Sequence, residues 1–169
     1  YRATQLFRWV YKKGSLDFTS MTNLSKELRG MLPHIFNLRL LPVMDALHGK
    51  DGTIKFGFEA EDGYIIESVF IPEKERNTLC ISSQIGCRMG CAFCVTGKMG
   101  FIRNLSVAEI IGQVMGVKHY LTNTPITNLV FMGMGEPMDN IENLIASLEI
   151  LKDPMGLDFS YRRITVSSA

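Results

Sequence analysis

The stretch Cys80-Ile-Ser-Ser-Gln-Ile-Gly-Cys87-Arg-Met-Gly-Cys91-Ala-Phe-Cys94 contains all four cysteines of the 169-residue chain. Three of them, Cys87, Cys91 and Cys94, form a C-x3-C-x2-C pattern. Three thiolates on one loop can ligate three irons of a cubane iron–sulfur cluster and leave the fourth iron open for a substrate or cofactor. The spacing therefore predicts a cluster that takes part in chemistry, not one that only stores or transfers electrons.

Two other uses of these cysteines compete with the cluster. Disulfides need an oxidising compartment, but the printed residues show no secretory hydrophobic segment, so we expect a cytoplasmic protein with reduced thiols. Structural zinc can take four thiolates, usually from two well-separated C-x2-C pairs. This chain instead has a C-x3-C and a C-x2-C in direct succession. The spacing favours the iron–sulfur cluster, with a zinc site as the alternative.

The composition is that of a chain able to bury a core, because 46% of the 169 residues are hydrophobic. This length allows one or two domains. No run of apolar residues is long enough for a membrane span. The net charge is +1, yet residues 1–50 carry eight Lys/Arg against three Asp/Glu. This basic segment is a candidate surface for nucleic-acid phosphates, and a solvated helical face explains its charge equally well.

Hydrophobic periodicity divides the chain into three expected parts. Residues 1–50 are expected to form a basic helical module, with one helix over 3–11 and a second capped by Thr22 or Asn23 and stopped by Pro33. The rest of that part is expected to be a mixed connection. Residues 51–76 are expected to form a β-hairpin turning at Asp62-Gly63.

From residue 77 onward, strand-like and helix-like segments alternate, which predicts parallel strands in an α/β fold. The expected strands are residues 78–84, 126–132 and 162–168, and the expected helices are residues 107–120 and 141–151. Ser106 and Glu109 form a capping-box pattern at the start of the first helix. Three strands are too few to close a barrel.

Candidate functional residues follow these strands, where the sites of α/β barrels gather. The cysteine loop follows the first strand, Gly133-Met-Gly-Glu-Pro137 follows the second, and Ser167 lies at the end of the third. Glu67 is the only charge on an otherwise apolar face of the expected hairpin. Its carboxylate is either buried there or reaches solvent from an edge strand.

The motifs resemble those of the radical S-adenosylmethionine (SAM) superfamily and, within it, the RlmN/Cfr group of RNA methyltransferases. Besides the cysteine pattern with Phe93, the resemblance rests on Ser82-Ser83-Gln84-x-Gly86, Thr96-Gly97, Gly100-x-x-Arg103-Asn104-Leu105, Glu109-Ile110 and Phe131-Met-Gly-Met-Gly-Glu136-Pro137. It implies that residues 77–169 are the first half of a partial (β/α) barrel. It also implies radical methylation of adenine C2 in 23S rRNA and tRNA through a methyl-cysteine intermediate.

The resemblance assigns a role to each candidate residue. Cys87, Cys91 and Cys94 are the implied ligands of a 4Fe–4S cluster, and SAM is the implied second cofactor. The implied SAM contacts are Gly133, Gly135, Glu136 and Ser167. Glu67 is the implied proton acceptor. Cys80 is the implied resolving thiol, which forms a disulfide with a methyl-carrying cysteine, although a free cysteine read alone is most often a small buried hydrophobe.

The resemblance also implies partners: 23S rRNA, tRNA and an electron donor, with no membrane and a monomer at full length. Because none of the four cysteines is left to carry the methyl group, we expect the chain to be the amino-terminal part of a longer protein. Two other functions stay open. One is the C8-methylating, resistance-type branch of the group, and the other is a zinc-binding RNA-interaction module.

Overall fold

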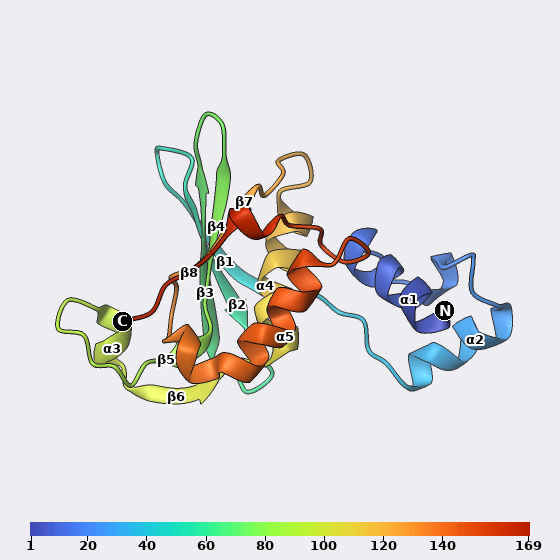
Figure 1. Cartoon of the computed structure of the whole chain (residues 1–169), viewed down its shortest axis with the longest axis horizontal. Coiled ribbons are helices and arrows are strands. Elements are labelled where there is room, and N and C mark those ends of the chain that lie inside the picture. The colour runs from blue at the N-terminus through green and yellow to red at the C-terminus, as the bar shows by residue number, and fades with distance from the viewer.

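The computed structural model describes residues 1–169 and consists of a small helical module joined to a larger α/β body (Figure 1). In Figure 1 the module lies at the right, and an extended segment leads from it to the sheet of the body. The body is built on a six-stranded sheet with a separate two-stranded ribbon. None of the helices combines the length and the hydropathy needed to span a bilayer.

The helical module has its own small core. Its elements are α1 (Arg2–Phe7), η1 (Arg8–Lys12), η2 (Phe18–Ser20), α2 (Lys26–Met31) and η3 (Leu32–His34). The buried side chains between them are Phe18, Met21, Leu24 and Leu32. The expected cap of the second helix was wrong, because Ser25 is the residue whose hydroxyl accepts a hydrogen bond from the Leu28 N–H.

The main sheet has the order β1-β2-β3-β4-β7-β8. Its strands are β1 (Val43–His48), β2 (Ile54–Glu59), β3 (Ile65–Pro72), β4 (Asn77–Ile81), β7 (Asn128–Phe131) and β8 (Ile164–Val166). The first four strands pair antiparallel, and β4, β7 and β8 pair parallel. The expected hairpin is thus continuous with the expected parallel strands, because β3 pairs with β4. The division of the chain at residues 50 and 76 stays a prediction.

Two helices cover one face of this sheet. They are α4 (Val107–Tyr120), which begins with the expected capping box of Ser106 and Glu109, and α5 (Ile141–Lys152). The side chains that fill the space between helices and sheet include Phe56, Phe58, Ile66, Leu79, Ile110, Val114, Leu129, Phe131 and Leu144. Because both helices pack on this face, the opposite face of the sheet is left open. The predicted α/β class with parallel βα units is confirmed.

A two-stranded antiparallel ribbon carries the cysteine loop. It consists of β5 (Gln84–Gly86) and β6 (Phe101–Asn104), and the short helix α3 (Val95–Lys98) lies between them in the chain. The expected strand over residues 78–84 is therefore split between β4 and β5. Gly86 has φ +72°, and a Cβ on it would lie 1.7 Å from the Gly100 carbonyl oxygen, so only glycine allows this crossing.

Candidate active site at the carboxyl ends of the parallel strands

The candidate residues gather where the three parallel strands end. The ribbon with the cysteine loop follows β4, the turn from Gly133 to Pro137 follows β7, and Ser167 follows β8. The cysteine loop and the carboxyl terminus lie at the same end of the molecule in Figure 1. Parallel strands end at one edge of a sheet, so the fold itself brings these distant segments together.

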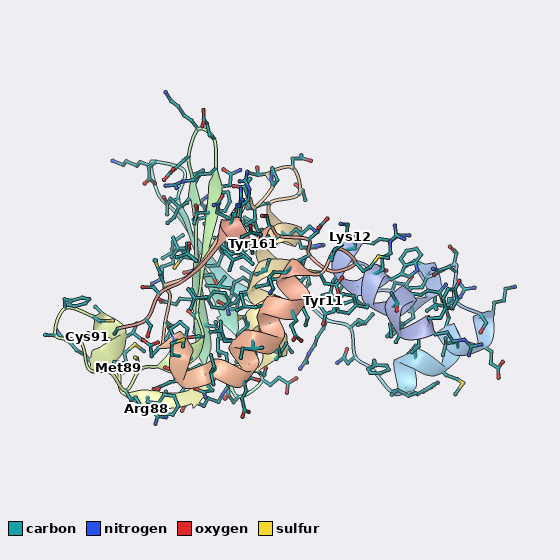
Figure 2. The ribbon with its side chains drawn as sticks, in the orientation of Figure 1. Tyr11, Lys12, Arg88, Met89, Cys91 and Tyr161 are labelled. Carbon is teal, nitrogen blue, oxygen red and sulfur yellow. The ribbon has the colours of Figure 1, made fainter.

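The cysteine loop is closed at its base by a backbone hydrogen bond. The Cys87 N–H donates to the Gly100 carbonyl at 3.1 Å, and the Cys94 N–H donates to the Cys91 carbonyl at 3.0 Å. Cys87 is buried, whereas Cys91 and Cys94 are partly exposed, and all the cysteines are free thiols. Figure 2 shows Cys91 and Met89 on the part of the loop that projects from the body.

The loop offers three thiols as candidate metal ligands, and the surroundings of one of them favour its thiolate form. Hydrogen bonds from backbone N–H groups, that of Gly97 first and that of Thr96 second, lower the pKa of the Cys94 thiol and favour the thiolate that binds metal. A 4Fe–4S cubane with one open iron takes three protein thiolates, and the loop supplies this number.

Polar side chains fix the base of the cysteine loop to the residues after the glycine turn. The Arg88 guanidinium lies 4.1 Å from the centre of the Phe101 ring and 3.3 Å from a carboxylate oxygen of Asp139. The Asn140 amide donates to the Ser83 and Leu105 carbonyls, each at 2.8 Å. These contacts hold both ends of the loop against η4 (Pro137–Asn140), so the loop and the turn form one structural unit.

The two glycines of the turn are required by its close approach to the end of β4 and to β5. A Cβ on Gly133 would lie 2.7 Å from the Ser82 Oγ, and one on Gly135, which has φ +101°, would lie 2.5 Å from the Gln84 Cβ. The Glu136 N–H donates to the Gln84 Oε1 at 2.8 Å. Tight packing inside the protein therefore explains both glycines, and their contact with SAM stays a prediction.

Glu136 connects the turn to the end of the third parallel strand. It is buried, and its carboxylate accepts from the Met138 N–H at 2.9 Å and from the Ala169 N–H at 3.0 Å. Burial acts to raise the pKa of Glu136, but these hydrogen bonds outweigh it and the pKa is lowered. Ser167 is exposed two residues before Ala169. A role of either side chain in SAM binding stays a prediction.

Glu67 and Cys80 lie on the open face of the sheet, on neighbouring strands. Val69 is directly opposite Cys80, and Glu67 is two residues from Val69 along β3, on the same face. Such diagonal neighbours are about 7–8 Å apart, within reach of long side chains. Burial raises the pKa of the Cys80 thiol, and a weaker hydrogen bond from the Met132 backbone opposes it. The structure thus places Glu67 and Cys80 on the same face of neighbouring strands, and their roles as base and resolving thiol stay predictions.

Glu67 reaches solvent, as one of the two expected alternatives has it, but it does so from an interior strand and not from an edge strand. The strand β3 lies between β2 and β4, so Glu67 is not on an edge strand. Its side chain is nevertheless 43% exposed, and its carboxylate pairs with the Lys55 ammonium at 2.6 Å. The carboxylate is therefore accessible from the open face and is held in place by a cation.

Sequence reasoning missed three residues that shape this site: Lys55, Ser82 as a hydrogen-bonding group, and Gln113. Lys55 is opposite Val69 in the β2–β3 register, so the expected hairpin could have placed it beside Glu67. Gln113 is a fully buried polar side chain among the apolar residues of α4. A single polar residue on the apolar face of the expected helix was the signal from which Gln113 could have been found.

Comparison with known proteins gives consistent matches. The model of the ribosomal RNA large subunit methyltransferase N-terminal domain matches residues 1–38. The dual-specificity RNA methyltransferase RlmN of Geobacter sulfurreducens is 49% identical over 169 residues, which are 100% of this chain and 46% of that protein. The RlmN of Desulfotalea psychrophila is 46% identical over 179 residues, covering 99% of this chain and 49% of that protein. The chain is related to the RlmN-type RNA methyltransferases.

The chain is also similar to a solved structure. The crystal structure of a radical SAM methyltransferase from Sphaerobacter thermophilus superposes with a TM-score of 0.88 at 41% identity, covering 99% of this chain and 50% of that one. The RlmN resemblance and the partial α/β barrel predicted from the motifs are therefore confirmed. The chain spans about half the length of the curated RlmN relatives that it matches.

Proposed function

We propose that this chain contains the cluster-binding and SAM-binding portion of an enzyme that methylates adenine C2 in 23S rRNA and tRNA. The observation that supports this proposal best is the arrangement at one end of the parallel sheet. There the three-cysteine loop and the glycine turn form one unit, beside an open face that carries Glu67 and Cys80. The relationship to RlmN-type methyltransferases supports the same reaction class.

In this proposal Cys87, Cys91 and Cys94 hold a 4Fe–4S cluster, and the turn from Gly133 to Glu136 borders SAM. When bound, these two cofactors supply radical chemistry, which is needed because adenine C2 is not a nucleophile. Glu67 takes the proton from C2 of the adenine, and Lys55 orients its carboxylate. Cys80 then forms a disulfide with the methyl-carrying cysteine as the bond between that cysteine and the RNA adduct breaks.

The basic helical module is proposed to bind the RNA. Lys13 lies 3.4 Å from the centre of the Trp9 ring, and Arg8 and Lys26 are exposed cations of the same module. Neutralised phosphates release counterions, so this part of the affinity falls as salt rises. A cytoplasmic location, an electron donor for the cluster and a monomeric full-length protein belong to the same proposal.

Anaerobic reconstitution tests the proposal. The chain is loaded with iron and sulfide, its absorption spectrum and metal content are recorded, and binding and reductive cleavage of SAM are measured. A brown protein that binds and cleaves SAM supports the proposal. A colourless protein that retains zinc instead contradicts it and favours the RNA-interaction module.

A further inference from the structure

The segments that carry the candidate site converge on two buried polar residues, Ser82 and Gln113. Both are 0% exposed. Ser82 lies just after β4, where the chain leaves the sheet for the cysteine loop, and Gln113 lies on α4. Buried polar groups are stable only when they are hydrogen-bonded, so the partners of these two residues show what they hold together.

The Gln113 amide hydrogen-bonds both backbone groups of Ser82, as a neighbouring strand would. Its Oε1 accepts from the Ser82 N–H at 2.8 Å, and its Nε2 donates to the Ser82 carbonyl at 3.0 Å. The same Oε1 accepts from the Ser68 hydroxyl of β3 at 2.8 Å, and Nε2 also donates to the Glu109 carbonyl at 3.3 Å. The amide is fully satisfied, and it fixes the backbone at the point where the chain departs from the sheet.

The Ser82 hydroxyl in turn joins two other segments of the site. It donates to the Glu67 carbonyl at 2.6 Å and accepts from the Met134 N–H at 2.8 Å. Met134 is the central residue of the glycine turn, and its carbonyl accepts from the Ser83 N–H at 2.9 Å. One hydroxyl group therefore links the proposed base, the start of the cysteine segment and the turn proposed to border SAM.

We propose that Ser82 and Gln113 are positioning residues that set the spacing between Glu67, the cysteine loop and the turn at Met134. This inference rests on the proposed function. The three segments belong to different strands, and reactions between bound groups lose rate steeply when the groups are displaced by about 1 Å. An apolar residue at position 113 would pack in the core, but it would leave the backbone of Ser82 without partners.

Four variants test this role in the reconstituted chain. Ser82→Ala removes the link to Glu67 and Met134, and Gln113→Leu removes the link to α4 while filling a similar volume. Ser147→Ala is the matched control, because Ser147 is equally buried and its hydroxyl has no partner. Leu151→Ala, in the core at the end of α5, controls for a general loss of stability.

The readout is SAM affinity, measured without turnover from the change that SAM produces in the electron paramagnetic resonance spectrum of the reduced cluster. Leaving the Met134 N–H unpaired is expected to weaken SAM binding about tenfold in Ser82→Ala, and a similar loss is expected in Gln113→Leu. Iron content should stay at the wild-type level in both. Ser147→Ala and Leu151→Ala should bind SAM as the wild type does.

The inference is overturned if Ser82→Ala and Gln113→Leu bind SAM like the wild type, or if they lose iron in proportion to SAM. It is also overturned if Leu151→Ala weakens SAM binding equally. A wild-type chain that binds neither cluster nor SAM contradicts the proposed function instead. In that case amide hydrogen exchange still decides the positioning role, which requires faster exchange at Met134 in Ser82→Ala than in Ser147→Ala.

Discussion

Glu67 is a half-exposed carboxylate on an interior strand, paired with Lys55. Glu67→Gln keeps the size of the side chain and removes its ability to take a proton. Because exposed ion pairs contribute about 0–1 kcal/mol, the free energy of unfolding should change little. The reconstituted variant should cleave SAM at the wild-type rate.

In a protein with the full length of its relatives, Glu67→Gln should stall before product release and accumulate RNA attached to the protein. Denaturing gel electrophoresis with labelled RNA measures this adduct. Lys55→Met is the companion variant, because it leaves the carboxylate without its orienting cation and should slow product release less severely. Normal turnover by Glu67→Gln would mean that Glu67 is only a structural carboxylate.

The cysteines are expected to separate into two classes by iron content. Ala in place of Cys87, Cys91 or Cys94 should abolish the reconstituted cluster and SAM cleavage, because each of these thiolates is proposed to hold one iron. Cys80→Ala should keep the wild-type iron content, because Cys80 lies on β4, outside the cysteine loop, and partial burial raises the pKa of its thiol. Iron and sulfide analysis after anaerobic reconstitution measures the difference. Loss of iron in Cys80→Ala would make Cys80 a ligand, and its assignment as the resolving thiol would be wrong.

At the scale of elements, Arg103 of β6 joins the turn before β3 to the start of α4. Its guanidinium pairs with Asp62 at 2.6 Å and with Glu109 at 2.7 Å. The hydrogen bond from Arg103 lowers the pKa of Asp62. Burial acts to raise the pKa of Glu109, but the bonds from Arg103 and Ser106 outweigh it and lower the pKa. The contacts of β6 with the turn before β3 and with the start of α4 therefore depend on the ionised carboxylates of Asp62 and Glu109.

This network predicts a pH dependence of stability. Carboxylates with lowered pKa values stabilise the folded state fully above their unfolded-state pKa, about 4, and lose this contribution as pH falls through the folded-state pKa. Arg103→Ala should lower the free energy of unfolding at pH 7 by about 1–3 kcal/mol, through the loss of the partly buried pair with Glu109. The difference between wild type and variant should shrink as the solution is acidified below about pH 4. Urea denaturation across this range measures it, and a difference independent of pH would contradict the prediction.

The elements with an uninterrupted local signal were predicted well, and those with an interrupted pattern or a pairing that depends on tertiary structure were not. The start of α4 follows from the capping box of Ser106 and Glu109, which is a local signal. The strand β1 was missed because a bulge between Val43 and Asp45 interrupts its alternation. The strand β6 was missed because its pairing depends on the crossing of Gly86 and Gly100, which are far apart in the chain.

The same distinction holds for the candidate site. Its cysteines and glycines stand in short motifs that a sequence displays directly. The roles of Ser82 and Gln113 come from contacts that join residues 31 positions apart, and a single sequence does not show such contacts. The sequence was enough to find the candidate reactive and ligand-binding residues, whereas the structure was needed to find the residues that hold them in position.

At the scale of the whole molecule, the helical module is attached to the body by few polar contacts. Lys12 pairs with Asp158 and donates to the Pro154 carbonyl at 3.0 Å, in the segment between α5 and β8. Figure 2 shows Lys12 and Tyr11 on the side of the module that faces the body. The module has its own core, so its removal should leave the body folded.

Removing residues 1–38 should therefore weaken RNA binding and leave cluster assembly and SAM cleavage intact. The cut is placed before β1, because a truncation at residue 50 would remove an edge strand of the sheet. Titration of RNA at several salt concentrations should show a lower affinity and a shallower salt dependence, since fewer phosphates are neutralised. Unchanged affinity and an unchanged salt slope would show that the module does not bind RNA.

The last prediction concerns what the 169 residues can do alone. The open face of the sheet leaves Glu67 43% exposed, and β8 pairs with β7 on one side only. Three of the four cysteines are proposed cluster ligands and Cys80 the resolving thiol, so none remains to carry a methyl group. We therefore expect the 169-residue chain to assemble a cluster but to form no methyladenine.

The assay incubates the chain anaerobically with SAM, a reductant and unmethylated rRNA, followed by mass spectrometry of the nucleosides. A protein with the full length of its relatives is the positive control, because it should form methyladenine under the same conditions. Any methyladenine from the 169 residues would mean that a methyl-carrying cysteine is not required. The Cys80 thiol would then need a different role, and its raised pKa, caused by burial, would fit a structural side chain on β4 better than a nucleophile.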